Sequence, residues 1–168
     1  VREGTVLGLP VRIFRVSFAG ELSYEINVNA NYGRVVWEAA MSAGENLGVT
    51  PYGTEAMHLL RAEKGYVIVG QDSDGSLTPD DLGVGGMVSR RKDFLGKRSL
   101  SREYTARADR KQLVGLLTEE PSEVLPEGGQ IVEGDASGMT MPMLGHVTSS
   151  YLSAKLGRSI AFAVLKDG

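Results

Sequence analysis

The feature that most restricts the fold is a strict alternation of apolar and polar side chains over residues 22–29. The apolar members Leu22, Tyr24, Ile26 and Val28 alternate with the polar members Ser23, Glu25, Asn27 and Asn29. A period of two places successive side chains on opposite faces of a strand, so the segment predicts a half-buried β-strand. Glu25 then projects from the polar face, where a rigid sheet could hold its carboxylate to accept two parallel N–H bonds from a flat heterocycle. On the pattern alone, a solvent-exposed glutamate is the simpler interpretation.

The composition is that of an ordinary globular chain, and it argues against several classes of site. With 168 residues, 42% hydrophobic and 23% charged, the chain can bury a core. The net charge of −3 gives no argument for nucleic acid or for an anionic membrane as a partner. Cysteine is absent, which excludes disulfides and thiolate metal sites, and the two histidines, His58 and His146, are too few for a zinc site without carboxylates. We therefore expect no metal.

The ends and the apolar runs of the chain bear on its location. No apolar run approaches membrane-spanning length and no signal-peptide pattern opens the sequence, so the cytoplasm is the expected location. The chain begins at Val1 without a methionine and soon enters a strand pattern, which we interpret as a piece of a longer polypeptide. The 22 glycines are roughly twice the usual frequency and predict many tight turns and short strands.

Local patterns predict an α+β fold, with an antiparallel sheet and packed helices before a second, strand-rich region. In the first region we expect a hairpin of strands 11–18 and 22–28, helices at 32–44 and 54–64, short strands at 66–69 and 82–88, a helix start at 78–81 and a short helix at 96–104. In the second we expect short strands at 112–117, 129–132, 144–149 and 159–165, with a loop at 134–143. Such strands suggest a small barrel or sandwich. A domain boundary is expected near residue 107.

Three ordered blocks of sequence carry a family resemblance. The first is Gly20-Glu21-Leu22-Ser23-Tyr24-Glu25-Ile26, the second combines residues 60–65, 70–72 and 77–83, and the third is Lys92-Asp93-Phe94-Leu95-Gly96-Lys97. In order and spacing they resemble the folate-binding region of the aminomethyltransferase, or glycine-cleavage T-protein, family. When residues 51–56 and 145–151 are included, the sequence is most similar to the C-terminal part of the alpha subunits of heterotetrameric sarcosine oxidases. The resemblance covers almost the whole chain.

The resemblance implies roles for particular residues. It makes residues 1–107 the C-terminal part of the folate-binding domain and residues 108–168 a small C-terminal β-barrel. It assigns the pterin of tetrahydrofolate to Glu25, whose carboxylate would take the ring N–H and the adjacent amino group as a fork. Phe18, where many relatives carry tyrosine, would stack on the pterin or pack in the core, and it cannot donate a hydroxyl hydrogen bond. Tyr24 is also expected among the residues that bind the cofactor. Arg61 would bind the glutamate tail of folate or the neighbouring Glu63.

For the whole enzyme the resemblance implies oxidative demethylation of sarcosine to glycine. Oxygen would be the acceptor, hydrogen peroxide a product, and the one-carbon unit would pass to tetrahydrofolate as methylenetetrahydrofolate. FAD, FMN and NAD are expected elsewhere in the complex, on the N-terminal part of the same subunit or on the other sarcosine oxidase subunits. The family's catalytic aspartate lies upstream, so we expect no catalytic residue in this chain and an inactive isolated fragment. Folate is the expected ligand, and neither nucleic acid nor membrane is an expected partner.

Two other interpretations stay open. The chain could belong to a T-protein-type aminomethyltransferase or a folate-dependent demethylase, which share the fold but run a different reaction. It could also be a non-catalytic assembly module, because Phe18 and Gly86 depart from the usual family pattern. The sequence upstream of this chain would separate the first of these from a sarcosine oxidase.

Two charged clusters have simpler explanations than binding sites. Four carboxylates lie close together in the sequence: Asp72, Asp74, Asp80 and Asp81. They do not form a calcium loop, because Gly75 comes too early and Gly83 occupies the twelfth position in place of glutamate. We expect helix capping and a solvated loop instead. The basic cluster over residues 90–98 is expected to be a solvated face, with attraction to a polyglutamate folate tail as the alternative.

Overall fold

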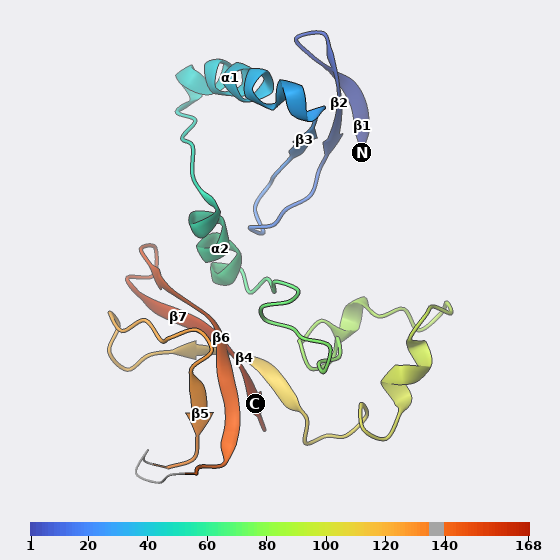
Figure 1. The fold of residues 1–168 in the computed structure, drawn as a ribbon, viewed down its shortest axis with the longest axis vertical. Coiled ribbons are helices and arrows are strands. Elements are labelled where there is room, and N and C mark those ends of the chain that lie inside the picture. The colour runs from blue at the N-terminus through green and yellow to red at the C-terminus, as the bar shows by residue number, and fades with distance from the viewer. Residues whose placement is uncertain (135–139) are drawn as a thin grey trace. The chain divides into compact units, whose positions relative to one another are not determined.

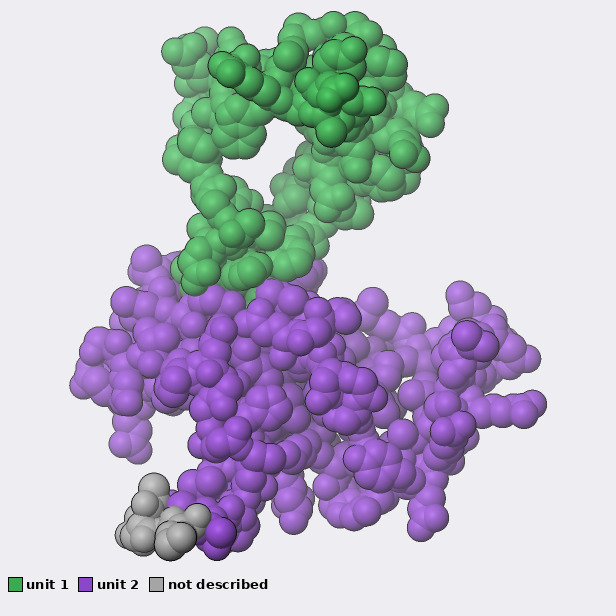
Figure 2. All heavy atoms as spheres, in the orientation of Figure 1, with its two compact units in different colours: residues 1–64 green, residues 65–168 purple. Residues whose placement is uncertain are grey.

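A computed structural model describes residues 1–134 and 140–168 of the chain. The chain divides into two compact units, residues 1–64 and residues 65–168 (Figure 2). Half of the loop expected at 134–143, residues 135–139, lies outside the described part. The boundary expected near residue 107 stays a prediction.

Unit 1 contains a three-stranded antiparallel sheet in the order β1-β2-β3 (Figure 1). Its strands are β1 (Arg2–Val6), β2 (Leu9–Phe14) and β3 (Glu25–Asn27). β1 and β2 form a tight hairpin, whose two turn residues Leu7 and Gly8 have φ of 50° and 77°. Positive φ at both positions is typical of a type I′ turn, which matches the twist of the flanking strands.

The hairpin predicted around Gly20 is wrong in its bounds. β2 ends at Phe14, a loop covers residues 15–24, and only three residues pair as β3. The first strand of the sheet, β1, was not predicted as a separate element. The loop is long because the chain between the paired strands makes turns of its own, with Gly20 at a φ of 76° and the Ser23 hydroxyl donating to the Glu21 carbonyl at 3.2 Å.

The two predicted helices of unit 1 are confirmed. They are α1 (Gly33–Gly44) and α2 (Thr54–Glu63), with the short 3-10 helices η1 (Ala30–Tyr32) and η2 (Glu45–Leu47) on either side of α1. The Asn29 side chain accepts from the Asn31 amide at 3.1 Å and so caps the 3-10 turn that leads into α1. After α2, Gly65 takes a φ of 76°, the left-handed conformation that glycine adopts without strain.

Unit 2 begins with turns instead of the strands predicted at 66–69 and 82–88. The first prediction corresponds only to an isolated bridge between Val69 and Ser73. Before the strand predicted at 82–88, Thr78 and Asp81 form the reciprocal bonds of a helix start. Within that segment Gly83 has a φ of 72°, and the chain then forms a 3-10 helix, η3 (Gly85–Met87). The helix predicted at 96–104 is also a 3-10 helix, η4 (Lys97–Ser101).

The rest of unit 2 is a four-stranded antiparallel sheet in the order β4-β7-β6-β5. Its strands are β4 (Lys111–Leu117), β5 (Gln130–Val132), β6 (Met143–Ser153) and β7 (Arg158–Lys166), so all four predicted strands are confirmed. Ala161, Ala163 and Val164 of β7 and Val147 of β6 are buried at the centre of this sheet. The antiparallel sheets and the two helices confirm the predicted α+β class. Within the described residues, no helix combines the length and apolar character needed to cross a membrane.

Candidate functional site

The first candidate site is the polar face of the sheet in unit 1. The register pairs Phe14 with Glu25, Ile13 with Ile26 and Arg12 with Asn27. Directly paired residues point to the same face, so Glu25 and Asn27 share a face with Arg12 and Phe14, and Ile26 lies on the other face with Ile13. The alternation predicted from the sequence is therefore present at these positions. The predicted half-burial of the apolar side chains is absent, since Ile26 is 42% exposed and Leu22 and Tyr24 are more exposed still.

A hollow of about 640 Å³ adjoins this sheet. It is lined by residues of all three strands, among them Glu3, Arg12 and Asn27, but Glu25 does not line it. Glu25 is exposed, and no described residue hydrogen-bonds to its carboxylate or pairs with it. Its two oxygens are thus available as acceptors for a ligand that approaches the polar face.

The other sequence-predicted residues divide between the loop, β3 and α2. Phe18 is 41% exposed and its ring contacts that of His58, with 6.0 Å between the ring centroids and a tilt of 33°. His58 lies three residues before Arg61 in α2, so the two share one side of the helix. Arg61 is fully buried. The structure therefore brings Phe18 to the side of α2 that carries Arg61. Tyr24 directly precedes β3 and is 59% exposed.

The first glutamate of the signature, Glu21, forms an ion pair within unit 1. Its carboxylate lies 2.7 Å from the Lys64 ammonium at the end of α2. A Cβ on the adjacent Gly20 would meet Lys64 Cγ at 2.6 Å, so the loop passes this lysine too closely for a side chain. Because both charged groups of the pair are substantially exposed, the ion pair contributes little stability.

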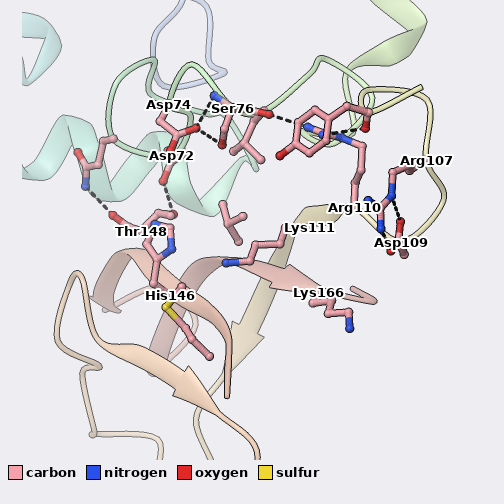
Figure 3. A pocket seen from close by; sticks show the side chains of 15 residues that line it. Asp72, Asp74, Ser76, Arg107, Asp109, Arg110, Lys111, His146, Thr148 and Lys166 are labelled. Carbon is pink, nitrogen blue, oxygen red and sulfur yellow. Dashed lines mark hydrogen bonds and ion pairs between the residues drawn. The ribbon is translucent and has the colours of Figure 1, made fainter. Parts of the chain in front are cut away.

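The second candidate site is a cavity of about 470 Å³ in unit 2 (Figure 3). Its walls come from the loop at residues 71–77, the segment at residues 104–111 and one face of the sheet formed by β4, β6 and β7. A buried hydrogen-bond network joins the loop to the sheet. Asp72, 1% exposed, accepts from the Thr148 hydroxyl at 2.7 Å, the Ser149 hydroxyl at 2.6 Å and the Ile68 amide at 2.8 Å. Three donors offset much of the cost of burying this carboxylate.

An irregularity in β6 makes the Asp72 network possible. Val147 pairs with Ala163 and Ser149 pairs with Phe162, which leaves Thr148 as an extra residue between them. Consecutive residues of a regular strand point to opposite faces, whereas a bulge can turn both side chains to one side. Thr148 and Ser149 consequently donate to the same oxygen of Asp72.

The prediction of a solvated loop at these carboxylates is wrong for Asp72. Sequence reasoning missed the residue because polarity alone suggests exposure. The available signal was the pair of hydroxyl residues Thr148 and Ser149 in a strand, which together can supply donors to a buried acceptor. Gln71 reinforces the contact, since its side-chain amide donates to the Thr148 carbonyl at 3.1 Å.

An ion pair holds the second wall of the cavity. Arg110 donates to both carboxylate oxygens of Asp81, at 2.6–3.0 Å, and also to the Ser76 carbonyl at 2.6 Å. The Thr78 amide donates to the same carboxylate at 2.7 Å and the Thr78 hydroxyl accepts from the Asp81 amide at 3.3 Å, so the bonds of the predicted helix start are present although no helix follows directly. Burial is the largest influence and acts to raise the pKa of Asp81, but the hydrogen bonds from Arg110 and Thr78 together outweigh it and lower the pKa.

Two further carboxylates line the cavity in local pairs. Asp74 accepts from the Ser76 amide at 2.8 Å and from its hydroxyl at 2.5 Å, and these bonds, with a smaller effect of the nearby His146, lower the pKa of Asp74. Asp109 pairs with Arg107 through two hydrogen bonds, which lower the pKa of Asp109. Within residues 1–134 and 140–168, no group of three or more potential ligand side chains is arranged to hold a metal ion.

Comparison with known proteins identifies the family. The family model described as "GCVT N-terminal domain" matches residues 1–92, and the model described as "Glycine cleavage T-protein C-terminal barrel domain" matches residues 111–168. The chain belongs to the glycine cleavage T-protein family. The family resemblance and the C-terminal barrel domain expected from the sequence are therefore confirmed.

Relatives within this family carry names of several kinds. The chain is 51% identical, over 96% of its length, to the sarcosine oxidase subunit alpha of Corynebacterium sp. (strain U-96), and 41% identical, over 93%, to that of Rhizobium meliloti. It is 35% identical, over 95% of its length, to the aminomethyltransferase of Streptomyces coelicolor. It covers 17%, 16% and 42% of these relatives, respectively.

A solved structure supports the fold. The aminomethyltransferase T of the glycine cleavage system from Bartonella henselae superposes with a TM-score of 0.74 and 22% identity, covering 92% of this chain and 41% of that one. At this level of identity the likeness concerns the fold alone.

Proposed function

We propose that this chain is the folate-binding, C-terminal portion of a sarcosine oxidase alpha-type subunit. The observation that carries the proposal is the 51% identity over 96% of the chain to a protein of that name. Because the chain spans only 17% of that relative, the partners we propose are the rest of the same subunit and the other subunits of the complex. The exposed apolar residues of unit 1, such as Leu22, Trp37 and Tyr52, suit contact with further protein.

In the proposed reaction the complex oxidises sarcosine at its methyl C–N bond. Two electrons pass to oxygen, which becomes hydrogen peroxide, and the one-carbon unit passes to tetrahydrofolate and leaves glycine. The redox cofactors FAD, FMN and NAD, which would carry the electrons, belong to other parts of the complex. The part of the enzyme represented by this chain holds the folate that accepts the carbon, and capture in a closed site prevents its loss as formaldehyde. The isolated chain is therefore proposed to be inactive.

The proposed folate contacts are Glu25, Phe18, Tyr24 and Arg61. Glu25 fits a pterin because its carboxylate is exposed on the polar face and both oxygens can accept from adjacent N–H groups. Tyr24 and Phe18 offer partly exposed rings for contact with a flat heterocycle. Arg61 is fully buried, so we assign it a positioning role in α2 in preference to direct contact with the folate tail.

The test of the Glu25 contact is calorimetric titration of the full-length subunit with folinic acid, comparing wild type with Glu25→Gln. Loss of one charged partner of a forked pair costs about 2–4 kcal/mol, so affinity should fall by about 30-fold or more. Glu21→Gln is the matched control, because Glu21 belongs to the same segment but pairs with Lys64. Equal affinity of wild type and Glu25→Gln would remove the pterin role.

A second candidate function is supported by the aminomethyltransferase relatives. An enzyme of that type would act on a carrier-bound aminomethyl group, or as a folate-dependent demethylase, without oxidising sarcosine. The full-length protein distinguishes the two: sarcosine-dependent peroxide formation supports the oxidase, and methylenetetrahydrofolate formation without oxygen uptake supports the transferase. If the full-length protein binds no folinic acid, the remaining interpretation is a non-catalytic assembly module.

A further inference from the structure

The cavity in unit 2 contains a concentration of positive charge that the folate proposal does not use. The register of the sheet pairs Lys111 of β4 directly with Lys166 of β7. It also pairs His146 with Val164, two residues before Lys166 on the same strand. Directly paired residues and alternate residues share a face, so Lys111, Lys166, Val164 and His146 all lie on the face that forms the cavity floor, and all four line the cavity.

Two like charges directly opposite each other destabilise an antiparallel pair. Figure 3 shows the Lys111 and Lys166 side chains on neighbouring strands with their amino groups directed apart, as mutual repulsion favours. Neither ammonium forms an ion pair with any carboxylate of residues 1–134 and 140–168. The sheet thus places two cations on one face without an ion pair, although Lys166 lies near enough to Asp109 for its charge to help lower the pKa of that carboxylate.

The remaining charges of the cavity are already engaged. Arg107 pairs with Asp109, and Arg110 with Asp81. Asp72 is buried and bonded to the sheet, so it does not face a ligand. Asp74 remains on the loop that faces the sheet, where the amide and hydroxyl of Ser76 hold its carboxylate (Figure 3).

We propose that this cavity binds a small molecule through a carboxylate or phosphate group held by Lys111 and Lys166. An ammonium is a compact point charge with three donors and can bond to an oxyanion of either kind. An anion between the two lysines would replace their repulsion with two attractions. The His146 imidazole on the same face offers a further hydrogen-bond donor. The cavity volume of about 470 Å³ is in the range of small-molecule sites.

The site walls are fixed before any ligand arrives. Asp72 fastens the loop to β6 by two hydroxyl bonds of 2.6–2.7 Å, and Arg110 fastens the segment before β4 to Asp81. Binding then needs little ordering of the chain, which favours affinity. The site is independent of folate binding, so failure of either proposal leaves the other unaffected.

The experiment is calorimetric titration of the full-length protein at constant ionic strength, with pyrophosphate as the phosphate probe and citrate as the carboxylate probe. We expect at least one probe to bind, and the double variant Lys111→Gln/Lys166→Gln to weaken it by at least about tenfold, since both charge-assisted contacts are lost. Lys111→Arg/Lys166→Arg, which keeps both charges, should retain most of the affinity. Which probe binds identifies the class of ligand.

The matched control is Lys155→Gln, since Lys155 is an exposed lysine of the β6–β7 turn and does not line the cavity. Its affinity for the probe should equal that of wild type. The proposal is overturned if neither probe binds the wild-type protein, if the double glutamine variant binds as tightly as wild type, or if Lys155→Gln weakens binding equally. Thermal melting of each variant checks folding. Lys111 is half-buried and Lys166 is exposed, so we expect both double variants to fold.

Discussion

Replacing Asp72 with asparagine tests the central contact of unit 2. Asparagine keeps the shape of the side chain and can retain one oxygen for the hydroxyls of Thr148 and Ser149. Its amide nitrogen must then occupy the position of the oxygen that accepts from the Ile68 amide at 2.8 Å. Two donors would face each other there, and the Ile68 N–H would lose its partner.

The loss of stability expected for Asp72→Asn follows from its three hydrogen bonds to Thr148, Ser149 and Ile68. Bonds to a charged group contribute about 1.5–3 kcal/mol each and neutral bonds about 0.5–1.5 kcal/mol, so the two hydroxyl bonds lose about 1 kcal/mol each. The unsatisfied amide costs a further 1–3 kcal/mol or so. A neutral amide is easier to bury than a carboxylate, which offsets part of this loss. We expect Asp72→Asn to lower the free energy of unfolding of unit 2 by about 2–4 kcal/mol.

The assay is urea denaturation of the full-length protein, with hydrogen exchange of the β6 and β7 amides as the report on unit 2. Hydrogen exchange of the α1 and α2 amides reports on unit 1 and separates its opening from that of unit 2. Asp74→Asn is the control, since Asp74 lies in the same loop but is exposed and bonds only locally to Ser76. A change below about 1 kcal/mol for Asp72→Asn, or one no larger than that of the control, would refute the reasoning.

Two further predictions concern acid stability and strand packing. The pKa of Asp81 is lowered in the folded protein, so its contribution to stability is full above its ordinary pKa near 4 and is lost as the pH falls through the folded value. Asp81→Asn should therefore flatten the acid limb of a stability–pH curve, and an unchanged acid limb would contradict this. Gly145→Ala should destabilise the sheet by about 1–3 kcal/mol in thermal melts, because a Cβ would lie 2.0 Å from the Val164 carbonyl oxygen. Gly115→Ala, where nothing lies within 4 Å of the added carbon, should melt near wild type.

The sequence predicted the helices and the C-terminal strands because their signals are local. The helical spacing of Val36 and its neighbours, and the short β-branched runs ended by glycine and proline, depend only on residues near in sequence. The strands predicted at 66–69 and 82–88 failed for the opposite reason. Those segments have apolar side chains but find no strand partner, and glycine at 83 with a φ of 72° supports a turn.

The candidate sites were less predictable because they depend on the register between distant segments. The placement of Glu25 on the strand face opposite Ile26 could be predicted, since the alternation around it is local, whereas its role as a site residue stays a prediction. The meeting of Lys111 with Lys166 could not be read from the sequence, because it requires the pairing of strands 55 residues apart. The bulge at Thr148 likewise becomes visible only when β6 is aligned with β7.

Burial in this chain is set by what faces each side chain, and not by the polarity of the side chain itself. Leu22 and Tyr24 are apolar yet exposed, because no described element covers them. Asp72 is charged yet buried, because a bulged strand supplies two hydroxyls on one face and a backbone amide supplies a third donor. The same bulge that makes the buried carboxylate tolerable also fixes the loop above the cavity floor. A cavity held open in this way keeps Lys111 and Lys166 accessible to a ligand, which a loop free to collapse onto the sheet would not do.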